Sequence, residues 1–289
     1  MTRIADADLL LNSDGSIYHL GLLPEHINDV VITVGDPDRV TQITDKFDSV
    51  EFKRQNREFV THVGTFRNHR LTVMSTGIGT DNIELFMTEL DALVNVDFNT
   101  RESKAEKRKL KIIRIGTSGA LQPEIPVGAH LCSEYAVGLD ALVAYYNLPM
   151  TEYEKSIASD ITNKVNLPVT PYVVEGSASL KAQFTSDMLV GNTITTPGFF
   201  APQGRRVRVP VRYPNMLNEL TGYRLNKGQG EFLLTNFEME TAGYYAMARL
   251  LGHEAISLNA IIVNRANGTI SNNPQGVVDG LIDKVLNRL

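Results

Sequence analysis

Four short glycine-containing segments follow apparent strands and could hold a bound anion. They are Gly35-Asp36-Pro37, Gly77-Ile78-Gly79, Gly116-Thr117-Ser118-Gly119 and the loop over residues 197–206. In open α/β sheets ligands bind beyond the carboxyl ends of the strands, and glycine lets backbone N–H groups come close to an anion. Arg39 follows the first turn and Arg114 precedes the third. A guanidinium offers paired donors for phosphate oxygens, so the arrangement favours an inorganic phosphate site, although any single turn of this kind is more often plain loop chemistry.

The same glycines do not complete a nucleotide-binding fingerprint. Gly77-Ile78-Gly79 matches half of a dinucleotide-binding turn, but Asn82 stands where the third glycine would be. The sequence also has no Walker A motif. We therefore expect no NAD site.

An acidic pair, Glu238-Met239-Glu240, stands at the start of an apolar helical pattern. The carboxylates could simply complement the positive end of that helix, which composition alone favours. They could instead accept hydrogen bonds from two neighbouring hydroxyls of a ligand. Five other polar residues are ambiguous one by one, because an isolated Arg or His is usually a solvated or structural group. These are His19, Arg57, Gln203, Arg205 and Arg265.

Strand-like and helix-like segments alternate along the chain, which predicts an α/β protein around a mainly buried sheet. Strands are predicted at 30–34, 59–66, 70–75, 111–115 (running into Gly116) and 255–263. Helices are predicted after Asp38 as cap, at 83–96 with Asp81 or Asn82 as cap, at 239–251 with Gly252 at its C-terminal end, and at 277–289. No repeat or linker divides the sequence, so we expect one domain over residues 1–289. The charged run at 99–109, within an insertion at about 97–110, is expected on the solvated rim.

Composition limits the classes of function. The 289 residues are 43% hydrophobic and 21% charged, and 28 Lys and Arg against 33 Asp and Glu give a net charge of -5. Such a balance has no general attraction for nucleic acid or anionic membranes, so an anion site must be local. Cys132 is the single cysteine, which rules out an internal disulfide and suits a reducing compartment. Neither a signal-peptide pattern nor an apolar stretch of about 20 residues is present, and we expect a cytoplasmic protein.

Several motifs in order resemble one family. They are Tyr18-His19-Leu20-Gly21-Leu22, Val34-Gly35-Asp36-Pro37-Asp38-Arg39-Val40, Arg57-Glu58-Phe59, Ser75-Thr76-Gly77-Ile78-Gly79, Arg114-Ile115-Gly116-Thr117-Ser118-Gly119-Ala120-Leu121-Gln122-Pro123, Glu238-Met239-Glu240 and Ile262-Val263-Asn264-Arg265. The chain resembles the nucleoside phosphorylase family and is most similar to bacterial uridine phosphorylases. The resemblance implies a single-domain, three-layer α/β fold with a central mixed, distorted sheet. It further implies a homo-oligomer, a dimer or a hexamer, with active sites shared across a dimer.

The resemblance also implies roles for individual residues. The phosphate-binding positions are matched by Gly35, Arg39, Arg57, Arg114 and Thr117, and Arg57 comes from the neighbouring subunit. The ribose-binding positions are matched by His19 (also from the neighbour), Met239 and Glu240. The base-binding positions are matched by Phe199, Gln203, Arg205 and Arg265. Arg114, Glu240 and Arg265 are the positions to which it assigns catalysis.

The implied reaction is phosphorolysis of uridine, or of deoxyuridine and related pyrimidine nucleosides, to uracil and ribose 1-phosphate. Phosphate is then a co-substrate, and no organic cofactor or nucleic acid takes part. Some relatives hold a monovalent cation with Glu, Ile and Ser; Glu58 and Ile78 match here, but Asn82 replaces the Ser. The sequence also departs from the family at Gly204, at Phe200-Ala201-Pro202 and over 207–231.

Two alternatives remain at this stage. One is a purine nucleoside phosphorylase or nucleosidase of the same fold, although such enzymes place an Asp where this chain has Arg265. The other is a non-catalytic nucleoside-binding or storage protein, since a fold alone does not prove activity. Retention of Glu240 and of the phosphate arginines favours an enzyme.

Overall fold

The computed structural model describes residues 3–226 and 230–289. Within these residues one sheet of 12 strands forms the centre of the molecule. Its strands are β1 (Val30–Val34), β2 (Ser49–Asn56), β3 (Phe59–Phe66), β4 (His69–Ser75), β7 (Lys111–Ala120), β8 (His130–Gly138), β9 (Tyr172–Glu175), β10 (Leu189–Thr195), β11 (Arg224–Asn226), β12 (Glu231–Glu238), β13 (Glu254–Asn264) and β14 (Thr269–Ile270). A separate pair is formed by β5 (Val96–Asp97) and β6 (Glu102–Ser103).

The sheet is mixed and distorted, as predicted. Its main path runs β11-β12-β10-β8-β13-β7-β1-β4-β3-β2. β1 is parallel to β4 and β7, whereas β13 is parallel to β7 and antiparallel to β8. β12 pairs with β10 and also with the end of β7, so β7, β13, β8, β10 and β12 close on one another. This closure places Phe237 of β12 directly opposite Gly119 of β7.

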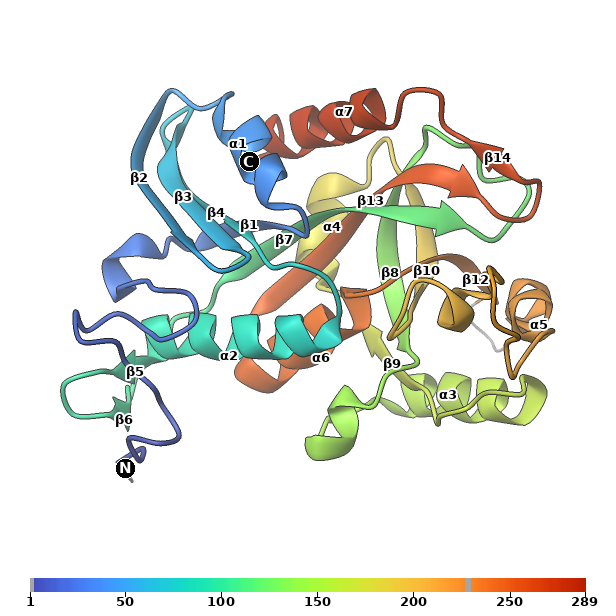
Figure 1. The fold of residues 1–289 in the computed structure, drawn as a ribbon, viewed down its shortest axis with the longest axis horizontal. Helices are drawn as coiled ribbons and strands as arrows, with labels where there is room; N and C mark the ends of the chain where they lie inside the picture. Colours follow the sequence, from blue (N-terminus) through green and yellow to red (C-terminus); the bar gives the residue numbers. More distant parts are fainter. Residues whose placement is uncertain (1–2, 227–229) are drawn as a thin grey trace.

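Helices cover both faces of the sheet (Figure 1). They are α1 (Pro37–Thr44), α2 (Thr80–Asn95), α3 (Glu152–Lys164), α4 (Ala178–Phe184), α5 (Met216–Gly222), α6 (Thr241–Leu251) and α7 (Pro274–Leu286), with 3-10 turns η1 (Pro24–His26), η2 (Leu142–Tyr145) and η3 (Ala201–Gln203). α6 packs on β8, β10 and β13, and α2 packs on α6. Figure 1 shows α1 and α7 on the other side of the sheet. The molecule therefore has the three layers that the sequence predicted.

Apolar side chains of α2 and α6 fill much of the main core. Tyr244 and Phe86 are fully buried, and their rings meet edge to face with centroids 6.4 Å apart. Such aromatic pairs contribute beyond the area that they bury. This packing holds the first turns of α6 in place, next to Glu238 and Glu240.

Several predicted boundaries were wrong, and one error matters for the site. Residues 116–119 are not a turn, because β7 continues through them to Ala120. They stay extended because β13 pairs with all four of them on one side, and β12 pairs with Gly119 on the other. The capping residues also differ: Asp36, not Asp38, caps α1, and Gly79 precedes α2 where Asp81 or Asn82 was expected. The strand at 255–263 and the glycine end of α6 were predicted correctly.

The two unusual segments have different structures. The charged insertion folds back as the β5–β6 hairpin, and the backbone O of Arg101 accepts a hydrogen bond from the N–H of Ile4 (2.8 Å). The 207–231 stretch contributes α5 and β11, whose Met216 and Leu220 enter a second core cluster; its residues 227–229 lie outside the described part. Across the described residues, no helix combines the length and apolar character needed to cross a bilayer.

Candidate active site

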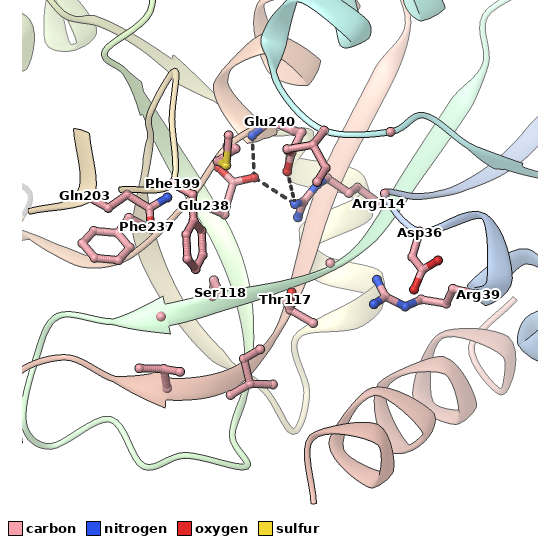
Figure 2. Close-up of a pocket in the computed structure, with 18 of the residues that line it drawn as sticks. Asp36, Arg39, Arg114, Thr117, Ser118, Phe199, Gln203, Phe237, Glu238 and Glu240 are labelled. Atoms are coloured by element: carbon pink, nitrogen blue, oxygen red, sulfur yellow. Dashed lines mark hydrogen bonds and ion pairs between the residues drawn. The ribbon is translucent and has the colours of Figure 1, made fainter. Parts of the chain in front are cut away.

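A cavity of about 550 Å³ opens at the carboxyl ends of the central strands. This is where ligands bind in open α/β folds. Each of β1, β4, β7, β10, β12 and β13 contributes to it, directly or through the loop that follows. The lining residues are Gly35, Asp36, Pro37, Arg39, Gly77, Ile78, Arg114, Gly116, Thr117, Ser118, Gly119, Phe199, Gln203, Arg205, Phe237, Glu238, Met239, Glu240, Ile262 and Val263. Figure 2 shows most of them around the cavity.

Arg114 binds two carboxylates at the centre of the site. Its Nη2 lies 2.7 Å from Oε2 of Glu240 and 3.0 Å from Oε2 of Glu238 (Figure 2). Its Nη1 donates to Ser257 Oγ and Asn259 Oδ1, both at 3.1 Å. The three charged side chains are less than a tenth exposed. Burial alone would lower the pKa of Arg114, but Glu238 and Glu240 outweigh it and raise that pKa, so the guanidinium stays charged.

The lack of a side chain at Gly116 leaves room for the guanidinium of Arg114. The two residues lie two apart on β7 and so share a face of the strand. A Cβ at residue 116 would lie only 2.0 Å from Nη1 of Arg114. The arginine can therefore fold back over the strand only because residue 116 has no side chain.

The two acidic residues differ in their contacts: one carboxylate bonds the start of the helix, and the other faces the cavity. Glu238 accepts hydrogen bonds from the backbone N–H groups of Glu240 (2.8 Å) and Thr241 (2.9 Å) at the start of α6. Glu240 accepts from the N–H of Gly79 at 2.9 Å and also lines the cavity. Burial and the nearby Glu238 raise the pKa of the Glu240 carboxyl, against the opposing effect of Arg114. Glu238 thus completes the helix start, and Glu240 faces the ligand space.

One end of the cavity is suited to an anion. Gly35 of the β1–α1 connection, Arg39 of α1 and Thr117 of β7 line it. Nη1 of Arg39 donates to the backbone O of Ile115 at 3.4 Å, which leaves its other donors for a ligand. Burial lowers the pKa of Arg39, with Asp36 acting in the opposite direction.

The other end is aromatic and cationic. The guanidinium of Arg205 lies 3.7 Å from the ring centroid of Phe199 and also binds the side-chain O of Gln203. Nε2 of Gln203 donates to Thr196 Oγ1 at 3.0 Å, so both ends of this buried amide are held. Arg265, a predicted site residue, is not among the lining residues of this cavity, but its guanidinium lies next to this end, 5.7 Å from the Phe237 ring centroid. Burial, and next the charge of Arg265, lower the pKa of Arg205 to about 10.

Comparisons with known proteins agree with this geometry. The sequence of this chain matches the family model of the phosphorylase superfamily over residues 29–284. The chain belongs to the phosphorylase superfamily.

Individual relatives of this phosphorylase are distant but cover nearly all of it. It is 27% identical over 266 residues to a uridine phosphorylase of Thermococcus kodakarensis, covering 91% of this chain and 83% of that one. It is 25% identical over 244 residues to a DeoD-type purine nucleoside phosphorylase of Buchnera aphidicola, covering 84% and 85%. A crystal structure of a Trypanosoma brucei nucleoside phosphorylase, described as showing uridine phosphorylase activity, has a TM-score of 0.91 at 26% identity and covers 98% of this chain and 99% of that one. The chain is therefore an enzyme of the pentosyltransferase class, and its fold was correctly predicted.

The phosphorylase cavity does not include all of the predicted site residues. His19 and Arg57 lie together elsewhere on the surface, because Nδ2 of Asn56 donates to the backbone O of His19 (2.8 Å). Nδ1 of His19 lies 2.7 Å from the carboxylate of Glu89 on α2. Arg57 is exposed and lies 5.9 Å from the Tyr18 ring centroid. Within one chain these two side chains therefore do not line the cavity.

The residues matched to a cation site lie near the glycine turn after β4. A Cβ on Gly77 would lie 3.3 Å from Cγ of Glu58 and 2.5 Å from Nδ2 of Asn82, so both side chains flank this turn. Glu58 brings a carboxylate, whereas Asn82 turns a donor nitrogen towards Gly77, which suits a cation less well. Cation binding here stays a prediction.

Sequence reasoning missed several lining residues of this phosphorylase. Two of them matter most. Phe237 adds an aromatic ring to the lining of the cavity, and Ser118 adds a hydroxyl group. Phe237 directly precedes the acidic pair, so its proximity in sequence was the available signal. Ser118 belonged to the segment 116–119, which was predicted to be a turn, and no separate role was assigned to its side chain.

Proposed function

We propose that this phosphorylase cleaves uridine with inorganic phosphate to give uracil and ribose 1-phosphate. The main support is the order of groups within one cavity. An anion end with Arg39 and Thr117 is followed by Glu240 at the centre and by Gln203 with Arg205 at the far end. A nucleoside and a phosphate need these three kinds of contact in that order.

The proposed chemistry uses these groups directly. A phosphate oxygen attacks the anomeric carbon of ribose while the bond to the pyrimidine nitrogen breaks and its electron pair leaves with the base. Arg39 and Arg114 align the phosphate, which replaces a bimolecular encounter by a positioned one. Glu240 holds the sugar hydroxyls and favours the positive charge that develops on the ribose. Arg205 and Arg265 stabilise the negative charge on the departing base.

The base end supports a pyrimidine over a purine. Asp36, Glu238 and Glu240 are the carboxylates among the cavity residues that the structure describes, and none belongs to the loop that carries Gln203. Arg265 follows the last central strand, where a purine enzyme would need a proton donor. A base that leaves as an anion needs cations here, and a buried amide with fixed ends selects one hydrogen-bonding edge.

Release of free base from uridine in the presence and absence of phosphate tests this function. We expect cleavage in phosphate buffer and almost none without phosphate. We also expect a higher kcat/KM for uridine than for inosine, adenosine or cytidine. Equal turnover without phosphate would indicate a hydrolase, and a higher kcat/KM for a purine nucleoside would refute the base assignment.

We propose further that the active unit is at least a dimer with shared sites. His19 and Arg57 match a sugar-binding and a phosphate-binding position, yet they lie together outside the cavity of their own chain. A two-fold partner could bring them to the neighbouring cavity. Arg57→Ala and Glu240→Ala should each be nearly inactive alone. After subunit exchange, one of the two sites in a mixed dimer carries neither change, so activity should partly return. If activity does not recover although mass measurement confirms the exchange, each subunit works alone.

A further inference from the structure

A chain of buried hydrogen bonds runs beneath the cavity from Arg114 to Ser118. Arg114 Nη1 donates to Asn259 Oδ1 (3.1 Å), and Asn259 Nδ2 donates to Ser133 Oγ (3.1 Å). Ser133 Oγ lies 2.6 Å from Thr193 Oγ1, which donates to Asn236 Oδ1 (2.9 Å). Asn236 Nδ2 donates to Ser118 Oγ (2.9 Å). The side chains that link the two ends are buried completely.

The directions of the bonds in this chain are set by its two amides, Asn259 and Asn236. A guanidinium can only donate, so Asn259 must turn its oxygen to Arg114 and its nitrogen to Ser133. At the other amide, Asn236 accepts from Thr193 through its oxygen and donates to Ser118 through its nitrogen. Thr193 has one hydrogen and gives it to Asn236, so Ser133 is the donor in the Ser133–Thr193 pair. Reversing Asn259 would place two donors face to face at Arg114.

Ser118 is consequently left with an unused donor. Its oxygen accepts from Asn236, and no protein acceptor for its O–H is recorded among residues 3–226 and 230–289. Ser118 lines the cavity, so the O–H can donate to a ligand there. Chains of hydrogen bonds that point one way polarise one another, which strengthens the last donor.

Ser118 also lies at the right place along the site. It stands on β7 between Thr117 at the anion end and Gly119, which faces Phe237 at the base end. Figure 2 shows Ser118 between Thr117 and the two aromatic rings. The bond that breaks in a phosphorolysis lies between these two ends.

We propose that Ser118 is a catalytic hydrogen-bond donor to the departing base, oriented by the chain that begins at Arg114. This rests on the proposed function. Its acceptor is the carbonyl oxygen next to the glycosidic nitrogen. As the glycosidic bond breaks, the electron pair moves onto that nitrogen and this oxygen, while the serine keeps its proton and stabilises the charge. The guanidinium that faces the sugar and phosphate is thereby joined, through buried side chains, to the donor at the base.

The test compares Ser118→Ala with Ser118→Thr on uridine and on 5-fluorouridine, whose base is the more acidic leaving group. Loss of one donor to a developing anion lowers kcat/KM by about 100-fold, and we expect this for Ser118→Ala on uridine. The loss should be clearly smaller on 5-fluorouridine, because its base needs less stabilisation. Ser118→Thr keeps the hydroxyl and should retain most of the activity. Thermal unfolding of each variant shows whether the fold is intact.

Asn236→Asp tests the direction of the chain. A carboxylate can only accept, so it would capture the O–H of Ser118 and lower kcat/KM although the serine is present. The same change in a Ser118→Ala background should then add little. Equal losses of Ser118→Ala on both substrates, or a loss below about threefold, would overturn the proposal. A wild-type enzyme that fails to cleave uridine would instead refute the proposed function, so the two failures are distinct.

Discussion

Gly116→Ala is expected to disable the enzyme through a single methyl group. The new Cβ would lie 2.0 Å from Nη1 and 2.5 Å from Cζ of Arg114. Ordinary contact begins at 3.4 Å, so the guanidinium must move by about 1.4 Å. A free arginine could make that movement easily, but this one is held by Glu238, Glu240, Ser257 and Asn259 at 2.7–3.1 Å. Its contacts with both carboxylates would be weakened at once.

The size of the effect follows from burial. Breaking a buried ion pair costs about 3–5 kcal/mol; partial loss should lower the free energy of unfolding by about 2–3 kcal/mol. A displacement of about 1 Å at a catalytic group can lower the rate about 100-fold, which we expect in kcat/KM for uridine. Urea unfolding and steady-state phosphorolysis measure the two quantities.

Gly222→Ala is the matched control for this prediction. Its Cβ would meet nothing within 4 Å, and Gly222 lies at the end of α5. This variant should have nearly wild-type stability and activity. If Gly116→Ala resembled Gly222→Ala in both measurements, Arg114 would not be held in the way that its contacts indicate.

Two further changes test other parts of the molecule. Glu154 is buried, and Arg249 holds both of its oxygens at 2.7 Å and lowers its pKa below 4.5 despite burial. A lowered carboxyl pKa contributes its full stabilisation above the ordinary pKa and loses it as pH falls through the lowered folded value. Glu154→Gln should therefore cost about 2–3 kcal/mol at pH 7 and progressively less as the solution is made acidic; a pH-independent difference in urea unfolding would contradict this. Thr196→Val removes the hydroxyl that accepts a hydrogen bond from Gln203 Nε2, and it should lower kcat/KM for uridine about tenfold. Thr196→Ser keeps this hydroxyl and should not lower kcat/KM. Equal kcat/KM values for the two variants would show that Thr196 does not orient Gln203.

The amino-acid sequence predicted the fold well where local pattern and tertiary structure agree. The apolar run at 255–263 became the central strand β13, and Gly252 ends α6 with a positive φ of 82°. The prediction failed for residues 116–119, since two glycines in four residues are typical of a turn. Strand pairing overrides that preference here, because β13 pairs with all four residues and β12 pairs with the last of them.

The residues of the candidate site were predicted better than the contacts between them. Gly35, Arg39, Gln203 and Arg205 line the cavity, as do the predicted central residues Arg114, Met239 and Glu240; the resemblance to a family, rather than local pattern, pointed to most of them. The contacts of Arg114 with Glu238 and Glu240 join residues more than 120 positions apart, and no local pattern encodes them. They arise only when β12 closes on β7.

The charges in the cavity support the proposal that a second subunit completes the site. Among the described residues that line the cavity, the cations Arg39, Arg114 and Arg205 stand against Asp36, Glu238 and Glu240, so three positive charges meet three negative ones. Arg114 is already neutralised by two carboxylates at hydrogen-bonding distance. A phosphate dianion entering this buried space would find no excess of positive charge, and binding would cost desolvation without sufficient attraction. Under the proposed function we therefore expect a further cation from outside the cavity. Arg57 is exposed and matches a phosphate-binding position, so its delivery by a second subunit would supply the missing charge.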